Sequence, residues 1–227
     1  IKYADAVVTV CQPIASWYEK HYNVPKVYVL RNVPVNPINA NTPLVKTTIF
    51  REKFSIPKEH IIFIYQGIID PARGILELID NFKRARPDRH LILMGYGSSE
   101  NYVKKVAQQI PNIHFQAAVP QKDIIQYTSS ADVGIFYIPS DNISLSYRYS
   151  LPNKFFEYLI GGLPVMISDN LEYLSELIEE NDLGWILSRN NEAFINFINS
   201  LTQEQINAKL GNGDTYSRKR GWRLEGG

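Results

Sequence analysis

A lysine and a glutamate three residues apart, Lys154 and Glu157, lie in the short apolar stretch SLPNKFFEYLIGGLPV (residues 150–165). Residues three or four apart share one face of a helix, which also brings Asn153 onto the face of Glu157. A helix N-terminus favours phosphate, Lys154 adds a positive charge there, and Glu157 can accept hydrogen bonds from ribose hydroxyls. The same spacing fits a solvated ion pair worth about 0.2–0.5 kcal/mol, and the residues alone support both interpretations equally.

The ends of this stretch predict the helix that places the pair. Pro152 suits a helix start, and Gly161 or Gly162 can end the helix. Apolar residues between them recur at helical spacing, so one stripe is expected to pack against a sheet. Lys154 then falls in the first turn, beside the positive end of the helix dipole.

A second candidate site lies in YQGIIDPARGILELI, residues 65–79. Gly67 ends an apolar run, and a glycine there lets a ligand approach the backbone. Arg73, followed by Gly74, can bind a diphosphate through two parallel hydrogen bonds. Taken in isolation, the segment is better explained as a tight strand-to-helix loop with a surface arginine.

The sequence lacks the motifs of several common enzyme classes. The sequence contains no Gly-x-x-x-x-Gly-Lys-Ser/Thr phosphate loop, no His-Glu-x-x-His and no Gly-x-Ser-x-Gly elbow. GYGS at residues 95–98 matches only half of a dinucleotide fingerprint and follows the second strand rather than the first. We predict no metal site, because the histidines are scattered and suit core or surface roles: His21, His60, His90 and His114.

The composition is that of an ordinary globular protein. Of 227 residues, 44% are hydrophobic and 21% are charged, with 24 basic against 23 acidic side chains. This balance gives no field that would attract nucleic acid, and the apolar runs are far shorter than the ~20 residues of a membrane span. The single cysteine, Cys11, excludes an intrachain disulfide and is expected to be a buried structural thiol in a reducing compartment.

The positioning elements follow a regular alternation. Apolar runs that predict strands lie at residues 60–67, 90–97, 112–119, 132–138, 163–168 and 183–187. Segments that predict helices lie at residues 75–85, 101–110, 122–131, 152–161 and 172–181. This alternation predicts an α/β, doubly wound parallel sheet of the Rossmann-like type, with ligands at the carboxyl ends of its strands.

Composition also suggests how the chain is divided. Residues 1–31 contain a strand, a helix and a second strand, and are expected to be the tail of a preceding domain. Residues 32–48, rich in Asn and Pro, predict a linker. Residues 49–200 form the main domain, and residues 201–227 a C-terminal helix or tail whose last residues have no predicted function. Because the chain starts with Ile1, we expect it to be a fragment.

The order of these motifs resembles the carboxyl-terminal, donor-binding domain of retaining GT-B glycosyltransferases, in particular family 4. The resemblance covers roughly residues 1–190 and implies the C-terminal half of a GT-B fold, preceded by the end of an acceptor-binding domain. Its most specific piece is LPNKFFEYLIGGLPV. The other segments that carry it are ADAVVTVC, IYQGIIDPARGILELI, LILMGYG and NIHFQAAVPQKDIIQYTSSADVGIFYIPS.

The resemblance implies a UDP- or GDP-linked sugar as donor. Arg73 and Lys154 would contact the diphosphate, Glu157 the ribose, and the backbone around Val119 and Pro120 the base. The resemblance implies a reaction that needs no cofactor and no metal, because cationic side chains and the helix dipole can neutralise the leaving diphosphate. The full set of expected donor contacts is Gly67, Arg73, Gly74, Val119, Pro120, Tyr149, Leu151, Asn153, Lys154 and Glu157.

The chain departs from the family pattern at two places. The family often has a glutamate eight positions before the ribose glutamate, and this chain has Tyr149 there. The family also has an arginine early in its phosphate loop, and this chain has Ile68 and Ile69 near that position. These departures imply a donor specificity unlike that of the best-known members, or a weaker activity.

The resemblance implies a hexosyltransferase-like enzyme of polysaccharide or glycan biosynthesis. Its acceptor would be a glycan or a lipid-linked saccharide, and its location cytoplasmic, with a peripheral place at the inner face of the membrane allowed. No catalytic residue is assigned, since acceptor-side groups are missing, and the fragment is expected to bind donor but transfer poorly. Two alternatives stay open: a nucleotide-sugar 2-epimerase of GT-B fold, and a non-catalytic nucleotide-sugar-binding module.

Overall fold

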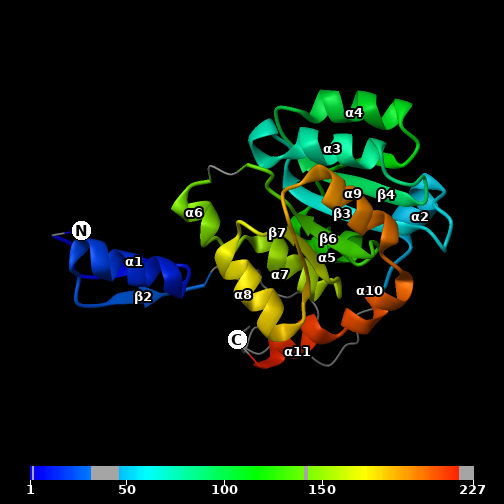
Figure 1. Ribbon diagram of the computed structural model, residues 1–227. Coiled ribbons are helices and arrows are strands. Elements are labelled where there is room, and N and C mark those ends of the chain that lie inside the picture. The colour runs from blue at the N-terminus through cyan, green and yellow to red at the C-terminus, as the bar shows by residue number, and fades with distance from the viewer. Residues whose placement is uncertain (2, 32–45, 141–142, 220–227) are drawn as a thin grey trace.

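The computed structural model describes residues 1, 3–31, 46–140 and 143–219. Its centre is a six-stranded, fully parallel sheet of order β5-β4-β3-β6-β7-β8 (Figure 1). The strands are β3 (Ile61–Ile68), β4 (Arg89–Tyr96), β5 (Ile113–Ala117), β6 (Val133–Phe136), β7 (Val165–Ser168) and β8 (Gly184–Leu187). This order is that of a doubly wound fold, so the predicted class and the six predicted strands are confirmed.

Helices cover both faces of the sheet. In Figure 1, α3, α4 and α9 lie on one face, and α5, α7 and α8 on the other. The predicted helices correspond to α3 (Ile75–Lys83), α4 (Glu100–Gln109), α5 (Ile124–Thr128), α7 (Asn153–Ile160) and α8 (Glu172–Asn181). The structure adds α2 (Ile49–Phe54), α6 (Leu145–Arg148), α9 (Asn191–Ser200) and the 3-10 turns η1 (Pro71–Arg73) and η2 (Gln121–Asp123). Where a C-terminal helix or tail was expected, it has two helices, α10 (Gln203–Lys209) and α11 (Asn212–Lys219).

The core consists of two layers, one on each face of the sheet. Along β3, Ile62 and Ile64 pack with α7 and α8, whereas Ile61, Phe63 and Tyr65 pack with α3 and α9. All five side chains are at most 2% exposed. A strand buried on both faces must be apolar throughout, which is why the sequence shows continuous apolar runs instead of alternation.

Residues before the central sheet form a separate two-stranded parallel sheet. Its elements are β1 (Val7–Thr9), α1 (Gln12–Tyr22) and β2 (Val27–Val29). Cys11 is fully buried, as predicted. Its thiol donates a hydrogen bond to the carbonyl of Tyr149 at 3.1 Å, and burial raises the pKa of the thiol. The predicted linker lies mostly at residues 32–45, outside the described residues. Over the described part of the chain, no helix has the length and apolarity to cross a membrane.

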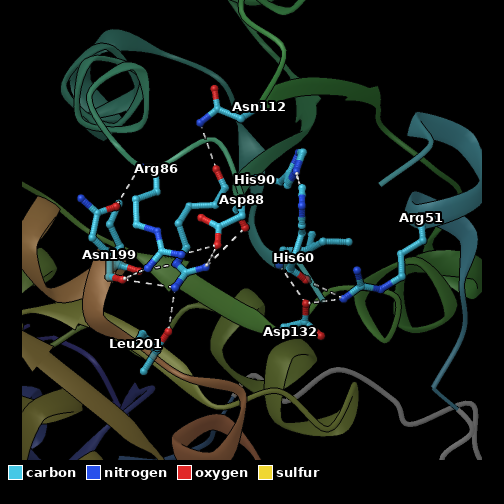
Figure 2. A network of polar contacts seen from close by, with 12 residues as sticks. Arg51, His60, Arg86, Asp88, His90, Asn112, Asp132, Asn199 and Leu201 are labelled. Carbon is cyan, nitrogen blue, oxygen red and sulfur yellow. Dashed lines mark hydrogen bonds and ion pairs between the residues drawn. The ribbon is translucent and has the colours of Figure 1, made fainter. Parts of the chain in front are cut away.

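A buried arginine at the start of β4 anchors the end of α9. Arg89, 6% exposed, donates to the carbonyls of Ile198, Asn199 and Leu201 at 2.7–3.2 Å (Figure 2). The guanidinium thereby satisfies carbonyls that the helix end leaves unpaired and places a positive charge at the negative end of its dipole. Asp88 pairs with Arg89 at 3.0 Å, which offsets part of the cost of burying that charge.

Three histidines, separated in sequence, form a continuous chain at the amino ends of β3, β4 and β5. His60 Nδ1 lies 2.9 Å from His90 Nε2, and His90 Nδ1 lies 2.9 Å from His114 Nε2. Each of these hydrogen bonds needs one N–H donor and one unprotonated ring nitrogen as acceptor. The three neutral histidines can therefore take up only one proton in total without losing a hydrogen bond. Burial lowers the pKa of His90 and His114 to about 4, and for His90 the neighbouring histidines and Arg51 lower it further, against Asp88.

The three hydrogen-bonded histidines predict that the domain loses stability in acid. The unfolded state binds protons at His90 and His114 near pH 6.5 and the folded state only near pH 4, so stability falls as pH drops through that window. We expect a loss of about 2–3 kcal/mol per histidine between pH 7.5 and 4.5, measured by urea unfolding. His90→Phe should flatten this slope, whereas His21→Gln, at an exposed position on α1, should not. Equal slopes for wild type and His90→Phe would contradict the assignment.

Candidate functional site

A cavity of about 560 Å³ opens at the carboxyl ends of β3 and β4, beside the N-terminus of α7. The chain winds from β3 to β5 on one side and from β6 to β8 on the other, so β3 and β6 flank the point where strand order reverses. Doubly wound folds bind ligands at this point. The lining residues are Tyr65, Gln66, Gly67, Ile68, Arg73, Met94, Gly95, Tyr96, Ala118, Val119, Ile124, Pro152, Asn153, Lys154 and Glu157.

Lys154 provides a positive charge inside this cavity. Its ammonium lies 4.0 Å from the ring centroid of Tyr65 and 5.1 Å from that of Phe136, so the charge is held by aromatic faces. No described residue accepts a hydrogen bond from it. Burial, together with the nearby charge of Arg73, lowers the pKa of Lys154 to about 7. A cation that lacks an acceptor and is partly dehydrated is suited to bind an anionic ligand.

Gly67 leaves room for the ammonium of Lys154. A Cβ atom at position 67 would lie 3.4 Å from Lys154 Nζ, and the φ of Gly67 is +123°, a backbone conformation that other residues rarely adopt. A glycine here therefore allows both the end of β3 and the lysine to lie against the same space. The sequence predicted the close approach of a ligand to this backbone, which stays a prediction; the structure shows the lysine beside it.

Glu157 is held by a side chain that the sequence analysis did not identify. Gln66 Nε2 donates to Glu157 Oε2 at 2.5 Å, and Thr128 Oγ1 donates to Gln66 Oε1 at 2.8 Å. Burial raises the pKa of Glu157, while the hydrogen bond from Gln66 and the charge of Lys154 oppose that shift. Lys154 and Glu157, both described residues, form no ion pair within 4.0 Å. The structure therefore does not contain the solvated Lys154–Glu157 ion pair that the spacing also allowed.

Arg73 reaches the cavity from η1. Its guanidinium lies 5.1 Å from the ring centroid of Tyr147, and no described residue accepts a hydrogen bond from it. Gly74 has a different role, since it has φ +72° and a Cβ there would lie 2.5 Å from the Cδ atom of Pro139. It contributes to the lining of a neighbouring cavity of about 620 Å³, so the structure explains this glycine by packing against the loop after β6.

The predicted donor contacts are brought together only in part. Six of them line the cavity: Gly67, Arg73, Val119, Asn153, Lys154 and Glu157. Pro120 lies one residue beyond the lining, where it precedes η2. Leu151 packs in the core, and Tyr149 lines a separate cavity of about 520 Å³ beside Trp17 and Tyr18 of α1. The carbonyl of Tyr149 accepts a hydrogen bond from the thiol of Cys11, which ties this segment to the first sheet.

Sequence reasoning missed Tyr65, Gln66 and Tyr96 as lining residues. A signal for Gln66 was present, because it is the one polar residue in the buried part of the apolar run before Gly67. Tyr96 is 62% exposed at the mouth of the cavity, and its place at the end of the second strand was visible in GYGS. Tyr65 was not predictable as a cation-binding ring, because its contact with Lys154 joins segments 89 residues apart.

The arrangement supports recognition of phosphate and a diol side by side. Two cations, Lys154 and Arg73, adjoin the N-terminus of α7, which no side chain caps. Glu157 offers carboxylate oxygens one turn along the same helix. Among the described residues, no cluster of His, Cys, Asp and Glu is arranged to hold a metal ion, and no histidine lines the cavity.

Comparison with known proteins shows the family and the fold. The family "Glycosyl transferases group 1" matches residues 46–218, which include α10 and all but the last residue of α11. No curated protein sequence matches the chain. Many solved structures are similar in fold, and three of them illustrate the match. Anabaena Alr3699/HepE in complex with UDP has a TM-score of 0.74 at 17% identity, over 99% of this chain and 63% of that one. WaaG, a glycosyltransferase of lipopolysaccharide biosynthesis, has a TM-score of 0.67 at 15% identity, over 97% and 62%.

The third structure is the C-terminal domain of a group 1 glycosyl transferase, LpcC from Francisella tularensis. It has a TM-score of 0.60 at 13% identity, and the alignment covers 83% of this chain and all of that domain. The chain thus spans about three fifths of the length of HepE and WaaG. Since the family match extends over most of the chain, this protein belongs to the group 1 glycosyl transferase family.

Proposed function

We propose that this chain binds a nucleotide-sugar donor for glycosyl transfer, with the diphosphate at Lys154 and Arg73 and the ribose at Glu157. The observation that carries the proposal is the lysine ammonium, which is partly buried against two aromatic rings and lacks an acceptor among the described residues. A pyrophosphate would supply that acceptor and would also meet the unpaired N–H groups of α7.

The nucleotide we propose is a uridine diphosphate sugar. HepE, which is similar in fold, was solved with UDP and with UDP-glucose. In this chain Val119 and Ala118, directly after β5, line the part of the cavity nearest η2 and are available to flank a base. Transfer is proposed to retain the anomeric configuration and to use a glycan or lipid-linked saccharide acceptor, in polysaccharide biosynthesis at the cytoplasmic face of a membrane.

The chemistry of the site favours transfer over epimerisation. A nucleotide-sugar 2-epimerase needs acid and base groups on both sides of its cleft, and among the described lining residues Glu157 is the only carboxylate, with no histidine beside it. Two cations and a helix dipole, by contrast, are suited to stabilise the negative charge that develops on a leaving diphosphate. We propose that no metal or cofactor is needed for that step, and that the 227-residue chain alone transfers poorly.

A thermal-shift panel of UDP-, GDP- and ADP-sugars tests the donor assignment. A ligand that binds only the folded state at 100 times its Kd stabilises by about 2.7 kcal/mol, or roughly 5–10 °C in Tm for a chain of this size. We expect the UDP-sugars to give the largest shift, and sugars without a nucleotide to give none. If no nucleotide sugar shifted Tm at millimolar concentration, the chain would not be a donor-binding domain.

A further inference from the structure

Gln66 is an unusual residue for its place in the fold. It lies near the end of β3, a central strand buried on both faces, and is only 3% exposed. Its backbone is fixed, because Gln66 N donates to the hydroxyl of Tyr158 at 3.1 Å, and that hydroxyl donates to Ile135 O at 3.0 Å. A polar side chain kept in such a position must satisfy its own donors and acceptor within the protein.

The side-chain amide of Gln66 has partners on both sides. Thr128, which is fully buried on α5, donates its hydroxyl to Gln66 Oε1 at 2.8 Å. The same hydroxyl lies 2.8 Å from Ile124 O, so two acceptors share one hydrogen. With its oxygen engaged by Thr128, Gln66 presents its Nε2 amide hydrogens to Glu157.

This orientation determines what Glu157 can do. An N–H donor stabilises the ionised carboxylate and so opposes the effect of burial. The bond engages Oε2, and Oε1 has no hydrogen-bond partner among the described residues, although Glu157 lines the cavity. One oxygen is thus fixed by the protein and the other remains for a ligand hydroxyl.

We infer that Gln66 is a positioning residue that holds Glu157 turned so that the bound nucleotide is recognised through its ribose hydroxyls. The inference rests on the proposed nucleotide site and adds to it a cause of selectivity for ribonucleotides. A carboxylate whose orientation is fixed loses little conformational freedom when a diol binds, whereas a free one must be ordered first.

The test compares UDP with 2′,3′-dideoxy-UDP by isothermal titration. Hydrogen bonds to an ionised group predict that the wild type prefers UDP by about 10- to 100-fold. Gln66→Leu should reduce that preference by about tenfold, because it should weaken UDP binding more than dideoxy-UDP binding. The matched control is Gln116→Leu, a glutamine of β5 that is 7% exposed, bonds to Lys53 and does not line the cavity. It should leave the preference intact.

A pH profile separates positioning from a merely structural effect. UDP affinity should fall as pH drops through the pKa of Glu157, and Gln66→Leu should move that fall to higher pH. Thr128→Val should shift it in the same direction, while Thr128→Ser, which keeps the hydroxyl, should restore the wild-type profile. Should Gln66→Leu fail to fold, the two Thr128 variants still provide the test.

The outcomes distinguish the inference from the function on which it rests. If the wild type binds neither nucleotide, the proposed donor site is wrong. If Glu157→Gln abolishes the preference for UDP but Gln66→Leu and Thr128→Val leave both preference and profile unchanged, the inference alone is overturned. Equal losses for UDP and dideoxy-UDP in Gln66→Leu would likewise overturn it, because they indicate a general distortion.

Discussion

Replacement of Lys154 by methionine is expected to weaken UDP binding by about 10- to 100-fold and, without ligand, to make the protein more stable. The first effect follows because the ammonium lacks an acceptor among the described residues and a diphosphate would provide one. The second follows because methionine fills a similar volume and removes a charge from a partly dehydrated place. A gain of about 1–3 kcal/mol, or roughly 3–10 °C in Tm, is expected at neutral pH.

The same lysine predicts how stability and binding depend on pH. Its pKa is about 7 in the folded protein, whereas an exposed lysine has a pKa of 10.5, so the unfolded state holds an extra proton between these values. Stability of the unliganded protein should therefore rise as pH is raised through that window, and this rise should vanish in Lys154→Met. A bound diphosphate favours the ammonium, so UDP binding at pH 8 should take up a proton.

Calorimetry in buffers of different ionisation enthalpy measures that proton directly. Lys154→Arg keeps a permanent charge and should bind UDP without proton uptake. Lys104 is the matched control, because its ammonium also lies over an aromatic ring, 5.1 Å from the centroid of Phe115, but outside the cavity. Lys104→Met should leave UDP affinity and stability almost unchanged. Wild-type affinity in Lys154→Met would contradict the phosphate assignment.

The fold could be predicted because its determinants are local. Each strand of the sheet is covered on both faces, so its residues must be apolar throughout, and each connection contains a helix that shows apolar residues at helical spacing. The position of the site followed from the same pattern, since parallel strands end at one edge. Gly67, Lys154 and Glu157 could be placed there from the ends of a strand and a helix alone.

The contacts that define the site could not be predicted, because they join distant segments. Gln66 and Thr128 are 62 residues apart, and nothing near either residue indicates that they meet. The direction of Tyr149 was likewise hidden, since it depends on how the first sheet sits against the loop before α7. The donor-contact prediction for Tyr149 relied on its position relative to Glu157, and that spacing spans a loop with no fixed periodicity.

The histidine chain is an intermediate case. His60 precedes β3, while His90 and His114 are the second residues of β4 and β5. The register pairs Ile62 with His90 and Ile92 with His114, an offset that brings successive rings into reach. Histidines at the starts of three consecutive predicted strands were visible in the sequence. Their contact required the sheet order, which periodicity does not give.

The second large effect is expected at Asp132, whose replacement by alanine should destabilise the protein by about 3–5 kcal/mol. The residue is buried just before β6, and its side chain is 1% exposed. Asp132 Oδ2 accepts from Arg51 Nη2 at 2.8 Å (Figure 2) and from Ile62 N at 2.8 Å, while Oδ1 binds Lys46. Alanine would leave the Ile62 amide without its acceptor, and it would leave the mostly buried Arg51 guanidinium with only the carbonyls of Pro57 and His60 and no charged partner.

The place of Asp132 in the sheet explains why the expected loss is large. β3 and β6 pair over only two positions, Phe63 with Val133 and Ile64 with Gly134, at the point where strand order reverses. Asp132 extends that short ladder, because its own N–H donates to Ile62 O at 2.8 Å while its carboxylate accepts from Ile62 N. The side chain thus replaces a backbone partner between the two strands that flank the cavity.

Urea unfolding of Asp132→Ala and of a matched control measures this contribution. Asp80 forms an exposed ion pair with Lys83 on α3, so Asp80→Ala should change stability by less than about 0.5 kcal/mol. In a double-mutant cycle, Arg51→Met should cost much less in the Asp132→Ala background than in the wild type, since the charge it removes has already lost its partner. Additive losses, or a loss below about 1 kcal/mol for Asp132→Ala, would show that the carboxylate does not hold β6 to β3.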